Sequence, residues 1–184
     1  MILDLSRLNP NGLEPLREVV RETRDDQRNS CFTVHWKGKY HCKLFIGKQP
    51  PTLDPKCAGI YSLAYDAILV RNFGSKAANR AKHRGGLPGT MLHEWCHRMQ
   101  FWCSDAWLGD WYYEGNHLRQ DELYDKWKHE FEAFYLSSSA VEMSAEAFRV
   151  LKGWRSAEPW EENQEFLADW RDFFISDPVF SLLF

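Results

Sequence analysis

The sequence contains no long apolar run, and that absence excludes a protein anchored by a membrane-spanning helix. Although 44% of its 184 residues are hydrophobic, no uninterrupted apolar stretch approaches the roughly 20 residues that a helix needs to cross a bilayer. The first residues also lack a basic segment followed by an apolar core, so we expect no signal peptide. We therefore expect a cytoplasmic location and no membrane partner. Delivery by a dedicated export system or a virus particle would leave no mark in the sequence.

A strong excess of positive charge is also missing. Lysine and arginine number 23 against 26 aspartate and glutamate residues, which gives a net charge of −3 and a pI near 6.2. Such a balance provides no general attraction for nucleic acid. The most basic segment, residues 71–84, is interpreted as a solvated loop. We therefore expect no nucleic-acid partner.

Paired cysteine motifs are absent as well. The chain has five cysteines, an odd number, and no two of them form a CxxC pair. They are Cys31, Cys42, Cys57, Cys96 and Cys103. This pattern excludes a disulfide framework and favours reduced thiols.

What the sequence does contain is enough apolar and aromatic material for one folded unit. Aromatic residues make up 15% of the chain and nine of them are tryptophan, which is typical of a packed core rather than of disorder. At this length we expect a single domain over residues 1–184. Residues 1–86 would form an N-terminal helix and a sheet, and residues 87–184 an active-site helix followed by further helices.

The hydrophobic periodicity predicts an α+β fold, with a small mixed sheet followed by helices. The predicted strands cover residues 31–36, 40–46, 58–63 and 67–72, and Lys37-Gly38-Lys39 is expected to join the first two as a hairpin turn. The predicted helices cover residues 13–28, a stretch around 90–102, and residues 121–135, 140–154 and 161–174. Residues 49–55 are expected to form a loop and residues 104–120 an irregular segment.

The most specific feature is the pentapeptide His93-Glu94-Trp95-Cys96-His97, an HExxH motif within an apolar stretch. At about 100° per residue, positions i and i+4 of a helix lie roughly 40° apart. Two imidazoles on one helical face can therefore bind a single ion. Glu94, beside the first of them, can reach a water on the metal and accept its proton.

Catalytic zinc needs a third protein ligand, and the sequence offers three candidates. Glu142 lies on the predicted helix that follows Ser137-Ser138-Ser139. Glu146 follows one turn later on the same face, where it could hydrogen-bond a ligand. Cys103 lies six residues after His97, but Gln100 replaces the glycine that would turn the chain towards it. His117 lies some twenty residues downstream of the motif.

A family resemblance favours Glu142. Residues from about 87 to 174 resemble the catalytic domain of anthrax toxin lethal factor and related gluzincin peptidases, which are members of the zincins. In that family HExxH is followed by a helix of the form ExxAEAFR, and here residues 142–149 read EMSAEAFR. The family also has a tyrosine seven residues before its glutamate ligand, a place that Tyr135 occupies.

The resemblance implies a zincin-like fold and a Zn²⁺ ion bound by His93, His97 and Glu142. It also implies that Glu94 is the general base and that Tyr135 stabilises the transition-state oxyanion. The sequence departs from the family at Cys96, where smaller residues are commoner, and in the aromatic residues around 107–113. These departures affect the expected substrate more than the expected chemistry.

The leading functional hypothesis is a zinc-dependent endopeptidase that hydrolyses peptide bonds of a protein or peptide substrate. An alternative is a zincin-fold structural or partner-binding protein without peptidase activity, for example in a viral or effector assembly. The intact Glu94 argues against it, because a structural site has no use for a general base. A zinc hydrolase acting on non-peptide amides is a third hypothesis. For a peptidase, residues 67–71 are a candidate strand for backbone pairing with extended substrate.

Overall fold

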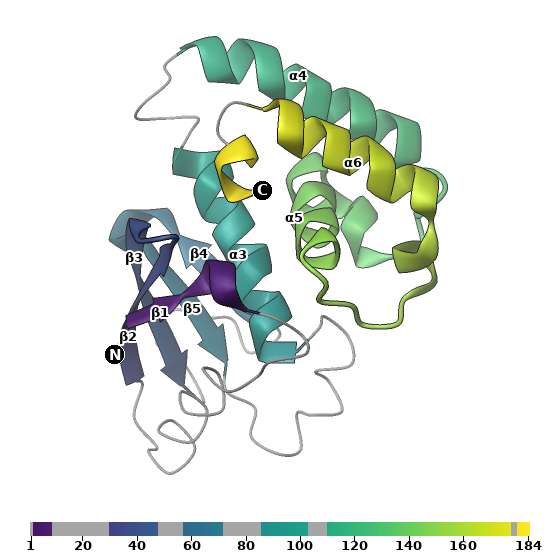
Figure 1. The fold of residues 1–184 in the computed structure, drawn as a ribbon. Helices are drawn as coiled ribbons and strands as arrows, with labels where there is room; N and C mark the ends of the chain where they lie inside the picture. Colours follow the sequence, from purple (N-terminus) through teal and green to yellow (C-terminus); the bar gives the residue numbers. More distant parts are fainter. Residues whose placement is uncertain (1, 9–29, 48–56, 72–85, 103–109, 178–179) are drawn as a thin grey trace.

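The computed structural model describes residues 2–8, 30–47, 57–71, 86–102, 110–177 and 180–184. Within these ranges the chain forms a five-stranded mixed sheet and four α-helices (Figure 1), which confirms the expected α+β class. The predicted helix over 13–28, the loop over 49–55 and most of the basic segment 71–84 lie outside the described residues. In the described ranges, no helix is both long enough and apolar enough to span a membrane.

The sheet has the strand order β1-β2-β3-β5-β4. Its strands are β1 (Ile2–Asp4), β2 (Ser30–Trp36), β3 (Lys39–Gly47), β4 (Gly59–Ser62) and β5 (Ala67–Arg71). β1 pairs with β2 in parallel and β3 with β5 in parallel, while β2 with β3 and β4 with β5 are antiparallel. Four of the strands fall where the periodicity predicts them. β1 was not expected, because three residues are too few to show an alternating pattern.

The predicted hairpin between β2 and β3 is confirmed. Its two central residues, Lys37 and Gly38, have φ values of 49° and 75°, as a two-residue turn with the right-handed strand twist requires. Glycine adopts such a φ without steric cost.

The interpretation of residues 67–71 as a substrate-pairing strand is wrong. β5 lies between β3 and β4 and pairs with both, so its backbone hydrogen-bonding groups are used within the sheet. The edge strand next to it is β4, whose four residues precede β5 in the chain. A buried apolar strand is placed inside a sheet by its partners, which a single sequence does not identify.

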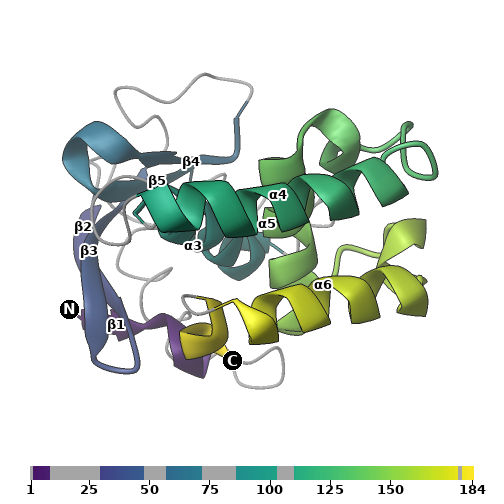
Figure 2. The ribbon, with the colours of Figure 1, turned by 90° about the horizontal axis from the view of Figure 1, so that it is seen from above.

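Helix α3 (Gly86–Trp102) carries the HExxH motif and lies across the sheet, where it contacts β4 and β5. Its other side packs against α5, so α3 lies between the sheet and the C-terminal helices (Figures 1 and 2). The helix continues through Gln100, as expected from the missing glycine. Arg98, buried on α3, donates from Nε to Asp66 at 2.8 Å and from Nη2 to the carbonyl of His41 at 3.1 Å. These bonds join the helix to the sheet.

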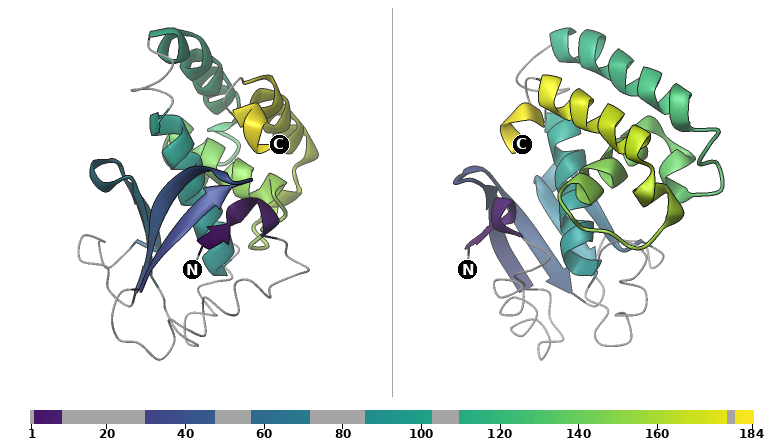
Figure 3. Two further views of the ribbon diagram at one scale, coloured as in Figure 1. Left: turned by 60° about the vertical axis from the view of Figure 1, so that its left-hand side comes forward. Right: turned by 45° about the vertical axis from the view of Figure 1, so that its right-hand side comes forward.

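The C-terminal part consists of α4 (Asp110–Trp127), α5 (Ala140–Leu151) and α6 (Gln164–Ser176). These three helices contact one another and gather on the far side of α3 from the sheet (Figure 3). The short 3-10 helices η5 (Tyr135–Ser138) and η6 (Pro159–Glu162) precede α5 and α6, and η7 (Phe180–Leu183) lies near the C-terminus.

The expected boundaries of three helices are corrected. Residues 110–120, expected to be irregular, are the first part of α4, and α4 ends at Trp127 rather than continuing to Tyr135. α5 ends at Leu151 rather than Trp154, because Gly153 has a φ of 87° and Trp154 N–H bonds back to the Arg149 carbonyl at 3.0 Å. α6 begins after Asn163, whose side chain caps the N–H of Phe166.

Candidate metal centre

Three side chains from two packed helices meet at one point. His93 and His97 come from successive turns of α3, and Glu142 comes from the first turn of α5, where the N-cap residue Ser139 accepts from the backbone N–H of Glu142 at 3.2 Å. His93 Nε2 lies 3.0 Å from His97 Nε2 and 3.1 Å from Glu142 Oε2. His97 Nε2 lies 3.5 Å from Glu142 Oε1. One ligand atom from each of the three residues lies within 4.8 Å of the others.

These separations suit a tetrahedral metal ion. Ligand atoms at about 2.0 Å from such an ion are about 3.3 Å apart along each edge of the tetrahedron, close to the 3.0, 3.1 and 3.5 Å found between the side chains. His93 is 2% exposed and His97 8% exposed. The three residues therefore form a shielded donor set of two imidazoles and one carboxylate.

The ring orientation of His97 is fixed by Gln100, one turn further along α3. The Gln100 amide donates to the Val141 carbonyl at 3.1 Å and to Ser144 Oγ on α5, so its Oε1 is the atom that faces His97 Nδ1 at 2.8 Å. Because an amide oxygen only accepts, Nδ1 of His97 carries the proton. The Nε2 lone pair of His97 is left facing the other two candidate ligands.

Glu146, one turn after Glu142 on α5, faces the other ring nitrogen of His93. Nδ1 of His93 lies 3.0 Å from Glu146 Oε1, while the other Glu146 oxygen accepts from Arg149 Nε at 2.9 Å. Arg149 is itself 1% exposed and also pairs with the buried Glu161 at 2.9 Å. A carboxylate facing Nδ1 favours the tautomer in which Nε2 of His93 carries a lone pair.

This arrangement places unfavourable contacts at the centre unless a cation lies there. The two Nε2 lone pairs point at each other and at a carboxylate, and Glu142 Oε2 is a buried oxygen that accepts no hydrogen bond from the residues that the structure describes. Burial disfavours charge on His93 and Glu142, yet the carboxylates of Glu142 and Glu146 raise the pKa of His93. The imidazoles in turn lower the pKa of Glu142. The raised pKa of His93 reflects the negative potential of the carboxylates around it, which favours a positive charge, and the donor set fits a metal ion.

Glu94 lies beside this centre and against the edge strand. It is 3% exposed, and burial raises its pKa although the imidazoles of His93 and His97 oppose the rise. The backbone N–H of Tyr61 in β4 faces its carboxylate. A Cβ added at Gly59 would lie 3.0 Å from Glu94 Oε1. The absence of a side chain at Gly59 therefore lets β4 approach α3 closely, next to Glu94.

Tyr135 is the first residue of η5 and is 50% exposed. It is therefore not a core residue. The structure does not describe the side chains of the other two candidates for the third ligand. Cys103 lies outside the described residues, and for His117 only the backbone of α4 is described.

Sequence reasoning missed Gln100 and Ser144 as parts of the site. Gln100 was noted only for the glycine that it replaces, and Ser144 lay within the EMSAEAFR segment without an assigned role. Their contact crosses from α3 to α5, over a separation of 44 residues. The available signal was the spacing, since Gln100 follows His97 by three positions and shares its helical face.

Comparison of the chain with protein-family models, with curated proteins and with solved structures found no match. The function is therefore inferred from the geometry of the site and from the HExxH motif.

Proposed function

We propose that the protein is a zinc-dependent endopeptidase of the zincin type. The observation that carries the proposal is the His93–His97–Glu142 cluster, because two imidazoles and one carboxylate form a frequent donor set of catalytic zinc. Such an ion, when bound, would polarise the scissile carbonyl and activate a water. With His93, His97 and Glu142 as its protein ligands, the ion would keep one coordination position for that water.

The residues around the cluster have roles that follow from their positions. Gln100 and Glu146 hold the two imidazoles with their lone pairs inward. Glu94 would accept a proton and deliver it to the leaving amine, and burial raises the pKa of its carboxyl group. In this proposal the Tyr135 hydroxyl would donate a hydrogen bond to the developing oxyanion.

The first experiment is the zinc content of the purified protein, measured by plasma mass spectrometry beside Glu142→Ala. We expect close to one zinc per chain in the wild type and a clear loss in the variant. Glu165→Ala is the matched control, because Glu165 is an exposed glutamate of α6 and lies far from the HExxH motif in the sequence. If Glu142→Ala retained its zinc, the third ligand would be a residue other than Glu142. A wild type that binds no added zinc would favour the alternative of a structural or partner-binding protein.

A second experiment separates a peptidase from an amidase. The zinc-loaded protein is incubated with a broad peptide library and with small non-peptide amides, and the products are identified by mass spectrometry. Cleavage within peptides supports the proposal, whereas turnover of the small amides alone would assign a different hydrolase.

Tyr135→Phe tests the oxyanion role. We expect the rate to fall by about 10²–10³ with the zinc content unchanged, as measured by peptide turnover and mass spectrometry. Thermal unfolding of the variant is the control for a folding defect. Turnover at the wild-type rate would remove Tyr135 from the mechanism.

A further inference from the structure

Arg149 is a buried charged residue two turns after Glu142 on α5. Its Nε donates to Oε2 of Glu146 at 2.9 Å, and its Nη2 donates to the same oxygen. Within the described residues, Arg149 forms no hydrogen bond or ion pair with any of the three candidate ligands. Its connection to the metal centre therefore passes through Glu146.

The guanidinium of Arg149 fixes the direction of the Glu146 carboxylate. Both hydrogen bonds engage Oε2, and the other oxygen of Glu146, Oε1, lies 3.0 Å from Nδ1 of His93. The donors of a guanidinium have a fixed planar geometry, whereas the ammonium of lysine is a point charge on a flexible stem. Arginine therefore holds the carboxylate in one orientation, with Oε1 towards the imidazole.

Arg149 is itself held by the segment that connects α5 to α6. Its Nη1 donates to the Trp154 carbonyl at 2.8 Å, and its Nη2 lies 2.9 Å from Oε1 of the fully buried Glu161. Glu161 Oε2 in turn accepts from the backbone N–H groups of Ser156 and Ala157, at 2.8 and 3.1 Å. The connecting segment thus supplies acceptors that hold the guanidinium.

The charges in this series of contacts are costly to bury. A buried ion pair is often no more stabilising than apolar side chains of similar volume, because the loss of hydration offsets the attraction of the charges. Packing between α5 and α6 therefore does not require charged residues at these positions. The contact of Glu146 with His93 does require Arg149, since without it the buried carboxylate would lose its charged partner and could turn away from the imidazole.

We propose that Arg149 is a positioning residue of the metal centre and that Glu161 holds Arg149 in place. Arg149 would align Glu146, and Glu146 would hold the proton of His93 on Nδ1, so that Nε2 faces the other candidate ligands. The inference rests on the proposed function only in that the metal centre is the site it serves. The metal-free protein provides a test that depends neither on zinc binding nor on peptide cleavage.

Hydrogen exchange of the His93 ring N–H, followed by NMR on the metal-free full chain, is the first experiment. A ring proton held by the Glu146 carboxylate exchanges slowly with water, because exchange requires the local structure to open. We expect Arg149→Met to speed this exchange by about tenfold or more, and Arg149→Lys to speed it less. Thermal unfolding of each variant is measured first. Unchanged exchange in Arg149→Met, or in Arg149→Lys if only that variant folds, would overturn the proposal.

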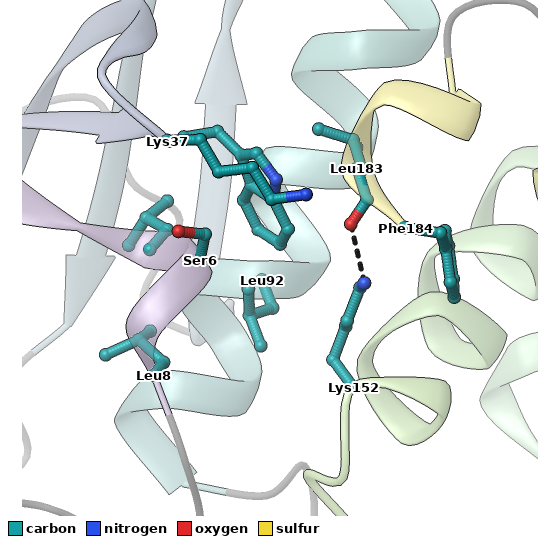
Figure 4. A pocket seen from close by; sticks show the side chains of 9 residues that line it. Ser6, Leu8, Lys37, Leu92, Lys152, Leu183 and Phe184 are labelled. Atoms are coloured by element: carbon teal, nitrogen blue, oxygen red, sulfur yellow. Dashed lines mark hydrogen bonds between the residues drawn. The ribbon is translucent and has the colours of Figure 1, made fainter.

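Lys152→Met is the matched control, because it removes another cation from the same end of α5. Lys152 directly follows α5, and its Nζ donates to the Leu183 carbonyl at 2.6 Å. It lines a cavity of about 150 Å³ between η1 (Leu5–Arg7) and η7, to which none of the candidate metal ligands contributes (Figure 4). Exchange of the His93 ring proton should therefore be unchanged. An increase equal to that in Arg149→Met would show a general loosening of α5 and would contradict the proposal.

Zinc affinity then tests whether Arg149 acts through Glu146. It is measured by competition with a chromophoric chelator for the wild type, Arg149→Met, Glu146→Gln and the double variant. We expect Arg149→Met to weaken zinc binding by about tenfold or more in the wild type, and by little once Glu146 is already replaced. Equal losses in both backgrounds would rule out an action through Glu146. A wild type that binds no zinc would contradict the proposed function, and the exchange experiment would still decide the role of Arg149.

Glu161→Gln tests the outer contact. The amide keeps the shape of the side chain but removes the charge opposite Arg149, so the His93 ring proton should exchange faster and zinc should bind more weakly. The control is Glu162→Gln, because Glu162 is the exposed neighbour of Glu161 and pairs with Arg155 at 2.6 Å. No difference between the two variants would overturn the role of Glu161.

Discussion

Single residues of the metal centre are coupled to the packing of the two helices that carry them. Gln100 contacts His97 on its own helix and both Val141 and Ser144 on α5. The same amide therefore fixes an imidazole tautomer and the distance between α3 and α5. Glu146 links His93 to the buried Arg149 in a similar way.

Gln100→Met should weaken metal binding without removing a ligand. The thioether fills a similar volume but accepts no hydrogen bond of comparable strength from His97 Nδ1, so the ring loses its preferred tautomer. We expect zinc affinity to fall by about 10- to 100-fold, measured by competition with a chromophoric chelator. Gln164→Met, at an exposed position of α6, is the control. Unchanged affinity in Gln100→Met would show that α5 alone orients the site.

Glu94→Gln should separate binding from chemistry. The amide is nearly isosteric and lies outside the candidate ligand set, so zinc content should remain near the wild-type value. Peptide turnover should fall by at least about 10², because the amide cannot accept the proton of the attacking water. Both quantities are measured on the same preparation. A variant that retains the wild-type rate would exclude Glu94 as the base.

For single residues, the sequence predicted the positions that follow from regular helical spacing. The helical repeat placed His93 and His97 on one face, and it placed Glu146 one turn from Glu142. The hydrogen bonds of Gln100 were not predictable, because they depend on which residues of α5 pack against α3. A single sequence contains no direct record of that contact.

At the scale of elements, the close approach of β4 to α3 determines what surrounds Glu94. β4 is a four-residue edge strand, antiparallel to β5, and it contacts α3. A Cβ at Gly59 would lie 2.7 Å from Thr90 Cγ2. That distance is shorter than van der Waals contact, so only glycine fits there without a shift of strand or helix.

Gly59→Ala should therefore destabilise the protein by about 1–3 kcal/mol, the usual cost of overpacking. Thr90→Ser removes Cγ2 and keeps the hydroxyl that donates to the Gly86 carbonyl at 3.1 Å. The double variant should recover part of the loss, since the shortest contact is gone. Urea unfolding of the wild type, both single variants and the double variant gives the coupling energy. Strictly additive effects would mean that the strand moves instead of meeting Thr90.

Element boundaries were the least predictable part of the fold. The strands β2 and β3 and the helix α3 have strong periodic or motif signals, and each was found at its expected place. Residues 110–120 have aromatic and charged residues on every side of a helix, so they give no amphipathic pattern, yet they belong to α4. The outer position of β4 and the inner position of β5 depend on long-range pairing, which local sequence does not specify.

At the scale of the whole molecule, distant segments of the chain meet on both sides of α3. One side of the helix faces the sheet and the other faces α5, and the candidate metal ligands lie on the second side. The cavity that contains Lys152 brings η1, from the beginning of the chain, next to η7, near its end. The charge of Lys152 affects the free energy of global unfolding, because unfolding separates these segments and exposes the lysine to water.

Lys152 should give the wild type a distinct dependence of stability on pH. Its pKa is lowered from 10.5 to about 8 by burial and by Lys37, so between these values the unfolded chain binds a proton that the folded protein has released. The free energy of unfolding then rises with pH through this window, and below pH 8 the buried charge lowers stability.

The measurement is the difference in unfolding free energy between the wild type and Lys152→Met, by urea titration from pH 7 to 10. Groups common to both proteins, including His93, cancel in this difference, and the wild type should gain relative to the variant as pH rises above 8. Lys126→Met is the control: the carboxylates of Asp169 and Glu165 raise the pKa of the exposed Lys126, so its difference should stay flat over this range. A flat difference for Lys152→Met would show that Lys152 keeps its proton in the folded protein, with water or an anion compensating its charge.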